Sequence, residues 1–398
     1  MSRLDELIQQ YCPNGVEHKE LQAILKIKNG SDYKAYGEGD IPVYGSGGIM
    51  TYIDRYVYNK PSVLIPRKGS IDKLYYVDTP FWNVDTIFYT EINTDLAIPR
   101  YVYHCLLREH LEQYNTAGGV PSLTQKVLNK IQIPLPPLEV QSEIVRILDN
   151  FTELTAELTA ELTARKKQYE YYRDMLLTAN NQYLHGKIID MLQQPITDGP
   201  HTTPSFVEHG IPFLSAEAVY DGKIHFEKRR GNITEEFNEE CCKKYRPQKH
   251  DVFMVKSGST TGKVGYVNTD ECFNIWSPLA AMRVNKENSS RFLFHLLQSR
   301  KIQQQVLAKA SHGSQPNLSM RALEQFDVVI PPLDMQLRIA DVLDNFDAIC
   351  SDLNIGLPAE IEARQKQYEY YRDILLTFAE SGSTILTDRQ TDRQTEYN

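Results

Sequence analysis

Apolar residues along two stretches of the chain recur with the spacing of a long helix. In the first stretch they alternate in steps of three and four residues, as in Ile144, Leu148 and Phe151. Such a stripe, sustained for about 40 residues, predicts roughly 60 Å of helix at about 1.5 Å per residue. It returns over residues 339–375, where a Gly-Leu-Pro step at 356–358 predicts a kink or a break. A helix with one apolar stripe needs a partner, and we expect the two helices to pack antiparallel.

Each helical stretch is preceded by the same three letters. The sequence PPL occupies residues 136–138 and 331–333. Proline suits the first turn of a helix and disfavours helix before it, so each PPL predicts a helix start.

The two helical stretches are copies of each other. Each has two blocks: IPLPPLEVQSEIVRILDNF (133–151) resembles VVIPPLDMQLRIADVLDNF (328–346), and RKKQYEYYRDMLLT (165–178) returns as RQKQYEYYRDILLT (364–377). A period of about 200 residues is too long for a solenoid and indicates a duplicated half-protein with pseudo-twofold symmetry. The first copy joins its two blocks with TAEL units at 155–162 and is four residues shorter there. One more unit would lengthen the helix by about 6 Å and turn its end by about 40°.

The bodies before the helices, residues 1–133 and 180–328, have a different pattern. They contain short β-rich runs between Gly, Pro and Asn turns: SVLIP (62–66), DTIFYTEI (85–92), DVFMVK (251–256) and VGYV (264–267). A weak alignment joins the bodies: Gly30 matches Gly199, Trp82 matches Trp276, RKGSIDKLYYV (67–77) resembles KSGSTTGKVGYV (256–267), and GGVPSLT (118–124) matches GSQPNLS (313–319). The bodies share a frame and differ in content, which indicates one fold with two diverged binding surfaces.

Composition sets broad limits. With 398 residues, 41% hydrophobic and 24% charged, the chain is typical of soluble globular proteins and allows two or three domains. It has no apolar run of membrane-spanning length and no hydrophobic signal region at the N-terminus, so we expect a cytoplasmic protein. Its six cysteines show no CxxC spacing, which favours reduced thiols over disulfides or a zinc site.

The net charge of −9 is unevenly distributed. Residues 139–174 net −3, residues 334–373 net −5 and the tail from residue 374 nets −2, so the rest of the chain nets +1. The acidity belongs to the helical repeats and the tail, and the near-neutral bodies with local basic clusters are compatible with a DNA partner.

No catalytic constellation stands out. The sequence SGSTTGKV at 257–264 resembles a phosphate-binding loop but has three residues between its glycines where four are needed, and Val264 replaces the Ser or Thr that holds magnesium. We therefore expect a turn there, no catalytic residues and no metal site.

The remaining signals suit binding. Cationic side chains mixed with aromatic and small polar residues are what phosphate positioning and base-edge readout require. The candidate DNA-binding residues are Arg67, Lys68, Ser70, Lys73, Lys228, Arg229, Arg230, Lys256, Ser259, Thr260 and Lys263, and a further basic cluster comprises Lys243, Lys244 and Arg246. On the residues alone, a solvated face over an ordinary core is the more common explanation of such clusters, and hairpin turns explain Gly69 and Gly258 equally well.

The order of a variable body, a PPL helix with a QYEYYRD block, a second body and a second such helix resembles one family, the specificity (S) subunits of Type I restriction–modification systems. The resemblance extends to CPNGVEHKEL at 12–21. It implies an α+β fold with two pseudo-twofold-related target-recognition domains, β-rich with helices, joined by two long antiparallel coiled-coil helices. The implied domains are recognition domain 1 (1–133), a central helical spacer (134–179), recognition domain 2 (180–328), a distal helical spacer (329–379) and a low-complexity tail (380–398).

The resemblance also implies a function and partners. The chain would be a non-catalytic reader of a split, asymmetric double-stranded DNA target, with one domain for each half-site. Two modification subunits would dock on the helices, and the docking residues we expect there are Tyr169, Tyr171, Tyr172, Tyr368, Tyr370 and Tyr371. Restriction subunits would join this core. The complex would be an adenine-N6 DNA methyltransferase and ATP-dependent endonuclease, with S-adenosylmethionine, ATP and magnesium in the partner subunits and no cofactor in this chain.

Two other functions compete with this one. A coiled-coil scaffold with two ligand-binding domains and no DNA role would explain the helices but not the near-identity of the QYEYYRD blocks. A stand-alone nuclease or methyltransferase is disfavoured by the missing catalytic motifs.

Overall fold

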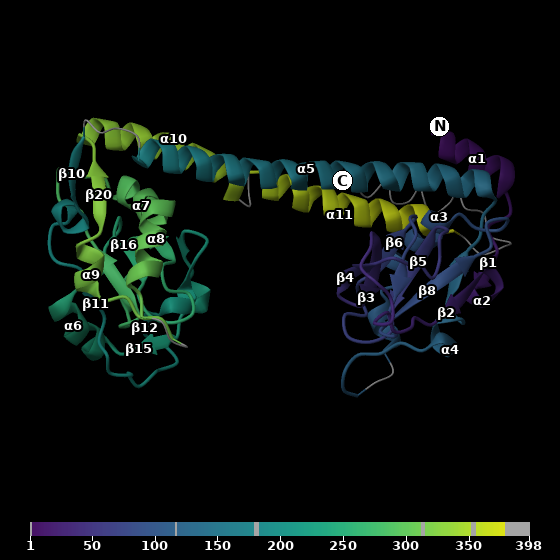
Figure 1. Cartoon of the computed structure of the whole chain (residues 1–398), viewed down its shortest axis with the longest axis horizontal. Helices are drawn as coiled ribbons and strands as arrows, with labels where there is room; N and C mark the ends of the chain where they lie inside the picture. The colour runs from purple at the N-terminus through teal and green to yellow at the C-terminus, as the bar shows by residue number, and fades with distance from the viewer. Residues whose placement is uncertain (1, 116–117, 179–182, 312–314, 352–355, 379–398) are drawn as a thin grey trace. The chain divides into compact units, whose positions relative to one another are not determined.

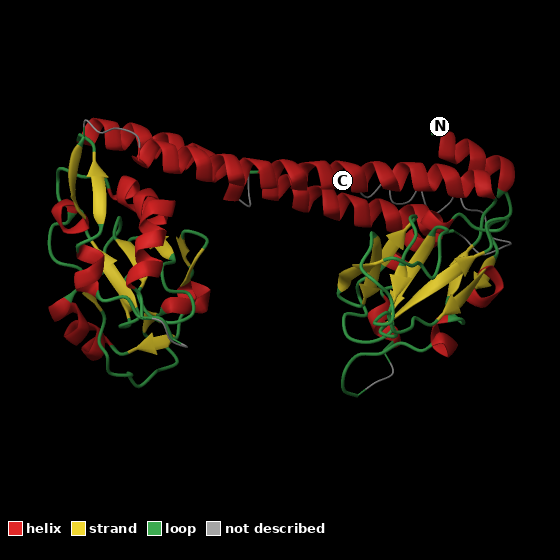
Figure 2. Cartoon of the chain, in the orientation of Figure 1, coloured by secondary structure: helices red, strands yellow, loops and turns green. Residues whose placement is uncertain are grey.

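The computed structural model describes residues 2–115, 118–178, 183–311, 315–351 and 356–378, so the expected tail at 380–398 lies outside it. The chain divides into two compact units. Unit 1 comprises Met1–Glu157 and Ile361–Asn398, and unit 2 comprises Leu158–Glu360. Both units mix helices with strands (Figure 2). Each combines one of the two bodies with parts of both helical repeats, because the division falls inside the repeats.

Unit 1 is built on three small sheets. The largest is antiparallel with the order β2-β8-β5-β6, formed by Leu25–Lys28, Ile87–Ile92, Ser62–Pro66 and Tyr75–Val77. The second has the order β4-β3-β7, formed by Gly48–Ile53, Ile41–Gly45 and Trp82–Asn83, and the third pairs β1 (His18–Glu20) with β9 (Gln132–Pro134). The helices of this unit are α1 (Arg3–Tyr11), α2 (Leu21–Ile24), α3 (Pro99–Arg108), the 3-10 turn η1 (Leu111–Tyr114), α4 (Gln125–Leu128), the first part of α5 (Leu138–Thr178) and most of α11 (Leu357–Leu376).

Unit 2 repeats the three sheets of unit 1. The order β11-β19-β16-β17 joins Thr197–Asp198, Leu279–Met282, Val252–Val255 and Val264–Tyr266. The order β15-β12-β18 joins Gly231–Ile233, Ile211–Leu214 and Asn274–Ile275, and β10 (Leu184–Lys187) pairs with β20 (Asp327–Ile330). As in unit 1, the three-stranded sheet contains one parallel pair, β3 with β7 and β12 with β18. The shared topology confirms that the two bodies are copies of one fold.

Unit 2 differs from unit 1 by what is inserted into this frame. Its additional elements are the hairpin β13 (Val219–Tyr220) and β14 (Lys223–Ile224), the helices α6 (Glu235–Lys244) and α8 (Arg300–Lys309), and the 3-10 turns η3 (Ala216–Ala218) and η4 (Phe226–Lys228). Its remaining described helices are η2 (Ile188–Met191), α7 (Ser290–Gln298), α9 (Met320–Glu324), α10 (Leu333–Ser351), the second part of α5 and the first turn of α11. The strands β12 and β15 lie at the end of unit 2 remote from α10 (Figure 1).

The helical repeats form as their pattern predicts. Helix α5 starts at Leu138, directly after the first Pro-Pro pair, and is continuous to Thr178. In the second copy α10 ends at Ser351 and a separate helix, α11, starts at Leu357 with Pro358 in its first turn. The predicted interruption is therefore a break between two helices. Pro358 lies in the first turn of the second helix, where proline is tolerated.

Each unit packs its body against blocks from both repeats. In unit 1 the first part of α5 runs opposite to α11 (Figure 1), and Phe151 stacks on Tyr371 with ring centroids 5.2 Å apart. In unit 2 the second part of α5 packs against α10, where the ring centroids of Tyr172 and Phe346 lie 5.8 Å apart. The first block of each repeat thus packs with its own body, and the second block packs with the other body. Buried apolar side chains of α5 and α11, such as Leu148 and Leu376, join the core of unit 1 directly.

One alignment between the bodies is wrong. The parallel ladders place Trp82 opposite Val43 and Asn274 opposite Phe213, so Trp82 is equivalent to Asn274 and not to Trp276. Trp276 instead donates its backbone N–H to Leu214, as Val84 does to Tyr44. Trp82 and Trp276 match by residue type alone, because they lie two positions apart in the equivalent segments of the two bodies. In the described part of the chain, every helix is too short or too polar to cross a membrane.

Candidate nucleic-acid interface

The two predicted Gly-Ser turns occupy equivalent places in their units. The N–H of Gly69 donates to the carbonyl of Pro121 at 3.0 Å, and the N–H of Gly258 donates to the carbonyl of Pro316 at 2.9 Å. The preceding residues form matching bridges, Lys68 with Ser122 and Ser257 with Asn317. Both glycines have left-handed backbones, with φ of 85° and 104°, which glycine adopts without a steric penalty. The sequence alignment of these turns is confirmed, as is that of the loop residues Pro121 and Ser122 with Pro316 and Asn317, whereas residues 313–314 of the aligned segment lie outside the described residues.

In unit 1 the turn presents lysines to solvent. Lys68 and Lys73 are exposed, and Ser70 is half-buried. The guanidinium of Arg67 is also half-buried and lies 5.8 Å from the centre of the Phe88 ring, within cation–π range. Lys68 and Lys73 are therefore the side chains of this turn best placed to reach a phosphate.

A second part of the unit 1 surface was missed in the sequence. The β3–β4 hairpin lies beside the turn, because the hydroxyl of Tyr75 donates to the carbonyl of Ser46 at 3.3 Å. Strand β4 exposes three large apolar side chains, Ile49 (50%), Met50 (58%) and Tyr52 (51%). The letters GIMTYI lack the alternation of a half-buried strand, and such a largely apolar run is typical of a buried one, so the exposed face had no signal in the sequence.

In unit 2 the equivalent turn presents Ser259 and Lys263, which are exposed, while Thr260 is half-buried. Thr261 holds the turn from inside, since its hydroxyl donates to the Gly258 carbonyl at 2.7 Å and to the Pro316 carbonyl at 3.2 Å. The turn is thus a rigid platform for two exposed polar side chains.

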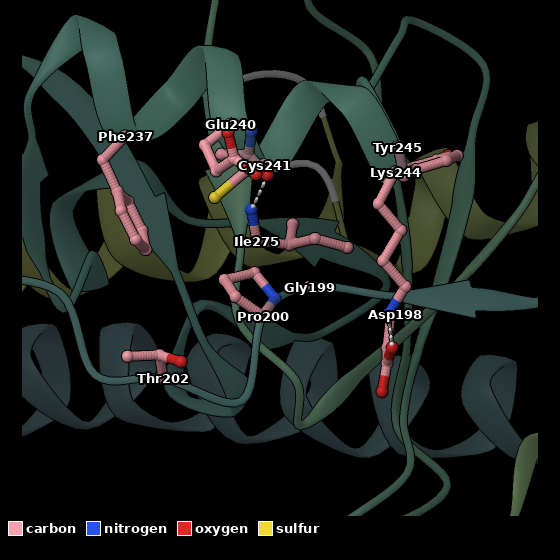
Figure 3. A pocket seen from close by; sticks show the side chains of 11 residues that line it. Asp198, Gly199, Pro200, Thr202, Phe237, Glu240, Cys241, Lys244, Tyr245 and Ile275 are labelled. Carbon is pink, nitrogen blue, oxygen red and sulfur yellow. Dashed lines mark hydrogen bonds and ion pairs between the residues drawn. The ribbon is translucent and has the colours of Figure 1, made fainter.

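Lys256 is placed differently from its expected role. It is 9% exposed, and its ammonium pairs with Asp198 at 3.3 Å, a carboxylate that is only 1% exposed. Lys244 of α6 pairs directly with the same carboxylate, and both residues line a cavity of about 310 Å³ (Figure 3). A buried charge needs a partner, so Lys256 anchors the turn to β11 and is not available to DNA.

The cluster at residues 228–230 is exposed and lies just before β15. The guanidinium of Arg230 lies 4.8 Å from the centre of the Trp276 ring and pairs with Glu217 at 3.3 Å. Two residues after Trp276, the Pro278 carbonyl accepts the N–H of Lys256 at 2.8 Å. The segment from Trp276 to Pro278 therefore joins this basic cluster to the Gly-Ser turn at one end of the unit.

The basic residues at the end of α6 and just after it do not form a free cationic patch. Lys243 pairs with Glu240, and Arg246 pairs with Glu239 at 3.0 Å. Together with the Lys244–Asp198 pair, these contacts neutralise the third cluster seen in the sequence.

The six candidate docking tyrosines separate into three pairs. Tyr169 and Tyr368 point inward and bond to histidines of the bodies at 3.0 and 2.9 Å. Tyr172 and Tyr371 pack on the phenylalanines of the other repeat. Tyr171 (66% exposed) and Tyr370 (48% exposed) face solvent. The last pair therefore has the largest exposed fractions among the six tyrosines and is the best placed to meet a partner subunit.

Among the described residues, no group of three or more His, Cys, Asp or Glu side chains has the arrangement of a metal site.

Comparison with known proteins identifies the family. The chain matches the Type I restriction modification DNA specificity domain over residues 13–165 and again over residues 206–363. It is 30% identical over 394 residues to a putative type I restriction enzyme specificity subunit of Haemophilus influenzae, covering 92% of this chain and 96% of the relative. The chain belongs to the type I DNA specificity family. It is also 35% identical over 306 residues to the EcoR124I/EcoR124II specificity subunit of Escherichia coli, covering 73% of each chain.

Solved structures show the same fold as this specificity chain. The S subunit of a type I system from M. genitalium superposes with a TM-score of 0.55 at 14% identity, covering 90% of this chain and 96% of the other. A chain from a study of complex assembly in the type I R-M system gives the same TM-score at 15% identity, covering 92% and 98%. The two matched specificity domains contain one Gly-Ser turn each, so both turns lie inside a domain of the DNA-recognition type.

Proposed function

We propose that the chain is the DNA sequence-recognition subunit of a type I restriction–modification complex, without a catalytic site of its own, and that each unit reads one half of a split, asymmetric target. The observation that carries this proposal is that the units share one frame and one Gly-Ser turn but differ around it. Unit 1 adds the exposed face of β4, and unit 2 adds η4, β13–β14 and α6. A common frame with different surfaces is what two different half-sites require.

The exposed residues at the two turns suit the two tasks of a DNA reader. Lys68 and Lys73 in unit 1, and Lys228 and Lys263 in unit 2, provide mobile charges for phosphates. Ser70 and Ser259 offer hydroxyls that can donate to or accept from base edges. The cation–π and ion-pair contacts of Arg230 fix its guanidinium in orientation, so it suits recognition of a defined group.

The function is tested by co-expression with a candidate modification subunit, followed by sequencing of the methylated genome. A split motif with adenine methylated in both halves is expected. The double variant Lys68→Ala/Lys73→Ala should weaken DNA binding and lower the slope of log affinity against log salt by about one per lost phosphate contact. Lys286→Ala, an exposed lysine beside the Pro331 end of unit 2, is the matched control and should leave both unchanged.

No new methylation in the presence of a stably assembled partner would contradict the DNA-reading function and favour a scaffold. Lys228→Ala/Lys263→Ala gives an independent check in unit 2. If both double variants bind as the control does, the reading surface is elsewhere on the two bodies.

We further propose that the helices dock two modification subunits through Tyr171 and Tyr370. These residues hold the same place in the two QYEYYRD blocks, so two identical partners would meet identical letters. Both side chains are exposed, and aromatic side chains are frequent anchors in interfaces. Tyr171→Ala/Tyr370→Ala should reduce co-purification of the modification subunit, whereas Glu170→Gln/Glu369→Gln on the same blocks should not.

A further inference from the structure

Each unit contains a cluster of arginine, histidine, aspartate and tyrosine that lies between its body and its helices. In unit 1 the members are Arg100 and His104 of α3, Asp149 of α5 and Tyr368 of α11. In unit 2 they are Arg291 and His295 of α7, Asp344 of α10 and Tyr169 of α5. Both histidines are fully buried. Nothing in the proposed reading of DNA uses these residues, yet they occur twice with the same connections.

The histidine is the centre of each cluster. In unit 1 its Nδ1 lies 2.9 Å from the Tyr368 hydroxyl and its Nε2 lies 2.9 Å from the Asp149 carboxylate. In unit 2 the distances to Tyr169 and Asp344 are 3.0 and 2.6 Å. A carboxylate only accepts, so Nε2 carries the proton and Nδ1 accepts from the tyrosine hydroxyl. Burial lowers the pKa of both histidines, which agrees with this neutral form.

The arginine ties the same aspartate to the sheet of the body. Arg100 donates from Nε to Asp149 at 2.8 Å, and its guanidinium lies 4.7 Å from the centre of the Tyr76 ring in β6. The equivalent contacts are those of Arg291 with Asp344 at 3.0 Å and with the ring of Tyr266 in β17 at 4.5 Å. Each aspartate is thereby satisfied by two donors from one helix of the body, four residues apart and so on one face.

The cluster joins three segments that are distant in the chain. The histidine belongs to the body, the aspartate to the repeat that follows this body, and the tyrosine to the other repeat. Apolar packing between these segments is non-directional, whereas buried hydrogen bonds are directional and costly to leave unmade. A body that slid or rotated on its two helices would break both bonds of the histidine.

We propose that His104 with Tyr368, and His295 with Tyr169, are positioning residues that fix the seating of each recognition domain on its helices and thereby the unread gap of the split target. This inference rests on the proposed function. It also gives an internal reason for the repeated blocks. Their first tyrosine meets a histidine in both units, and the arginine four residues later lies over that tyrosine, Arg173 over Tyr169 at 5.4 Å and Arg372 over Tyr368 at 5.7 Å.

The test compares variants that remove one group at a time. Tyr368→Phe deletes only the hydroxyl, His104→Phe deletes both hydrogen bonds, and the third variant combines the two. Glu369→Gln, the exposed neighbour of Tyr368, is the matched control. Each chain is assembled with the modification subunit and given DNA that carries both half-sites at gaps from two shorter to two longer than the preferred one.

We expect the wild type and Glu369→Gln to methylate one gap. Tyr368→Phe should raise methylation at neighbouring gaps about tenfold, the effect of losing one buried hydrogen bond, without changing the half-site bases. The combined variant should match His104→Phe alone, because the two residues act through one contact. Tyr169→Phe, with Glu170→Gln as its control, should reproduce the result in unit 2.

Unchanged gap selectivity in Tyr368→Phe and His104→Phe would overturn the proposal, even if the variants melt at lower temperature, because a merely structural role predicts that result. Altered half-site bases would also overturn it. If the wild type itself yields no split motif, the proposed function fails instead. Amide hydrogen exchange of the free chain then tests the seating: the backbone amides of α3 should exchange faster in Tyr368→Phe than in Glu369→Gln, and equal rates would contradict the role.

Discussion

Arg67 and Lys256 occupy equivalent positions at the start of their Gly-Ser turns, but their side chains have different surroundings. Arg67 is half-buried and its guanidinium lies over the ring of Phe88, whereas Lys256 is buried against Asp198. The difference arises because unit 2 places a carboxylate on β11 behind the turn. A cation in a basic cluster is therefore available to DNA only if it does not already form an ion pair with a buried carboxylate.

This difference predicts the effect of Lys256→Met. The substitution leaves Asp198 buried with fewer partners, so it should lower the free energy of unfolding by about 2–4 kcal/mol. Lys263→Met, an exposed lysine of the same turn, should change it by less than about 0.5 kcal/mol. Denaturant unfolding of the two variants checks this, and equal stabilities would show that the Lys256–Asp198 pair contributes nothing.

The buried histidines predict a pH dependence. Burial lowers the pKa of His104 and His295 more than the neighbouring carboxylates raise it. Such a group binds fewer protons in the folded state, so stability is lost as pH falls below the ordinary histidine value of about 6.5. For Asp344, burial acts to raise the pKa, but hydrogen bonds from His295 and Arg291 outweigh it and lower the pKa to about 2. Its contribution is lost only as pH falls from the ordinary carboxyl range towards 2.

The measurement is the melting temperature at pH 7.5 and at pH 5.5. The decrease between the two should be larger in the wild type than in His104→Gln/His295→Gln, although the variant melts lower at pH 7.5. Equal decreases would mean that these two histidines do not control the acid sensitivity.

At the scale of elements, each helix start is held by a glutamine three residues after its PPL step. The side chain of Gln141 accepts from the N–H of Ile98 at 2.8 Å and donates to the carbonyls of Leu96 and Pro136 at 2.9 and 2.7 Å. At α10, Gln336 accepts from the N–H of Ser289 and donates to the carbonyl of Pro331 and to the side-chain oxygen of Asn288. Both glutamines are fully buried. The glutamine of each first block therefore satisfies backbone groups where the body meets its helix.

Gln141→Ala should lower the free energy of unfolding by about 1–3 kcal/mol, because it leaves a buried N–H and two carbonyls without their partner. Ser142→Ala, the exposed neighbour, is the control and should have little effect. Chemical denaturation compares them, and a Gln141→Ala protein as stable as the control would show that water replaces the glutamine.

At the scale of the whole molecule, the chain consists of two copies of one half, and each copy contributes its second helical block to the core of the other. Each body packs with the first block of its own repeat and the second block of the other. Each kind of block must therefore pack against both bodies. This requirement explains why the two copies of each block have similar sequences while the exposed surfaces of the bodies differ.

The TAEL units provide a test of the gap at this scale. One additional unit in the 155–162 region should extend α5 by four residues, about 6 Å, and turn its end by about 40°. We expect the methylated motif to keep both half-sites and to lengthen its unread gap. Methylome sequencing reports both, and a change of half-site bases would contradict a role of α5 in setting the gap.

The sequence alone determined the elements and the duplication. The start of α5 at Leu138, the break before α11, strands such as β5 and the equivalence of the two Gly-Ser turns depend on local patterns or on letters repeated at a constant interval. Helix periodicity, proline geometry and left-handed glycines act over a few residues, so they can be recognised without a fold.

Only the tertiary structure decided which partners the chemically interesting residues have. Tyr169 meets His295 across 126 residues of sequence, and Tyr368 meets His104 across 264. Whether Lys256 faces DNA or Asp198, and which tyrosine of a QYEYYRD block faces solvent, depends on segments that come together only on folding. Burial and hydrogen-bond satisfaction are properties of such distant contacts, and for this reason the sequence showed that the blocks repeat but not what each tyrosine in them does.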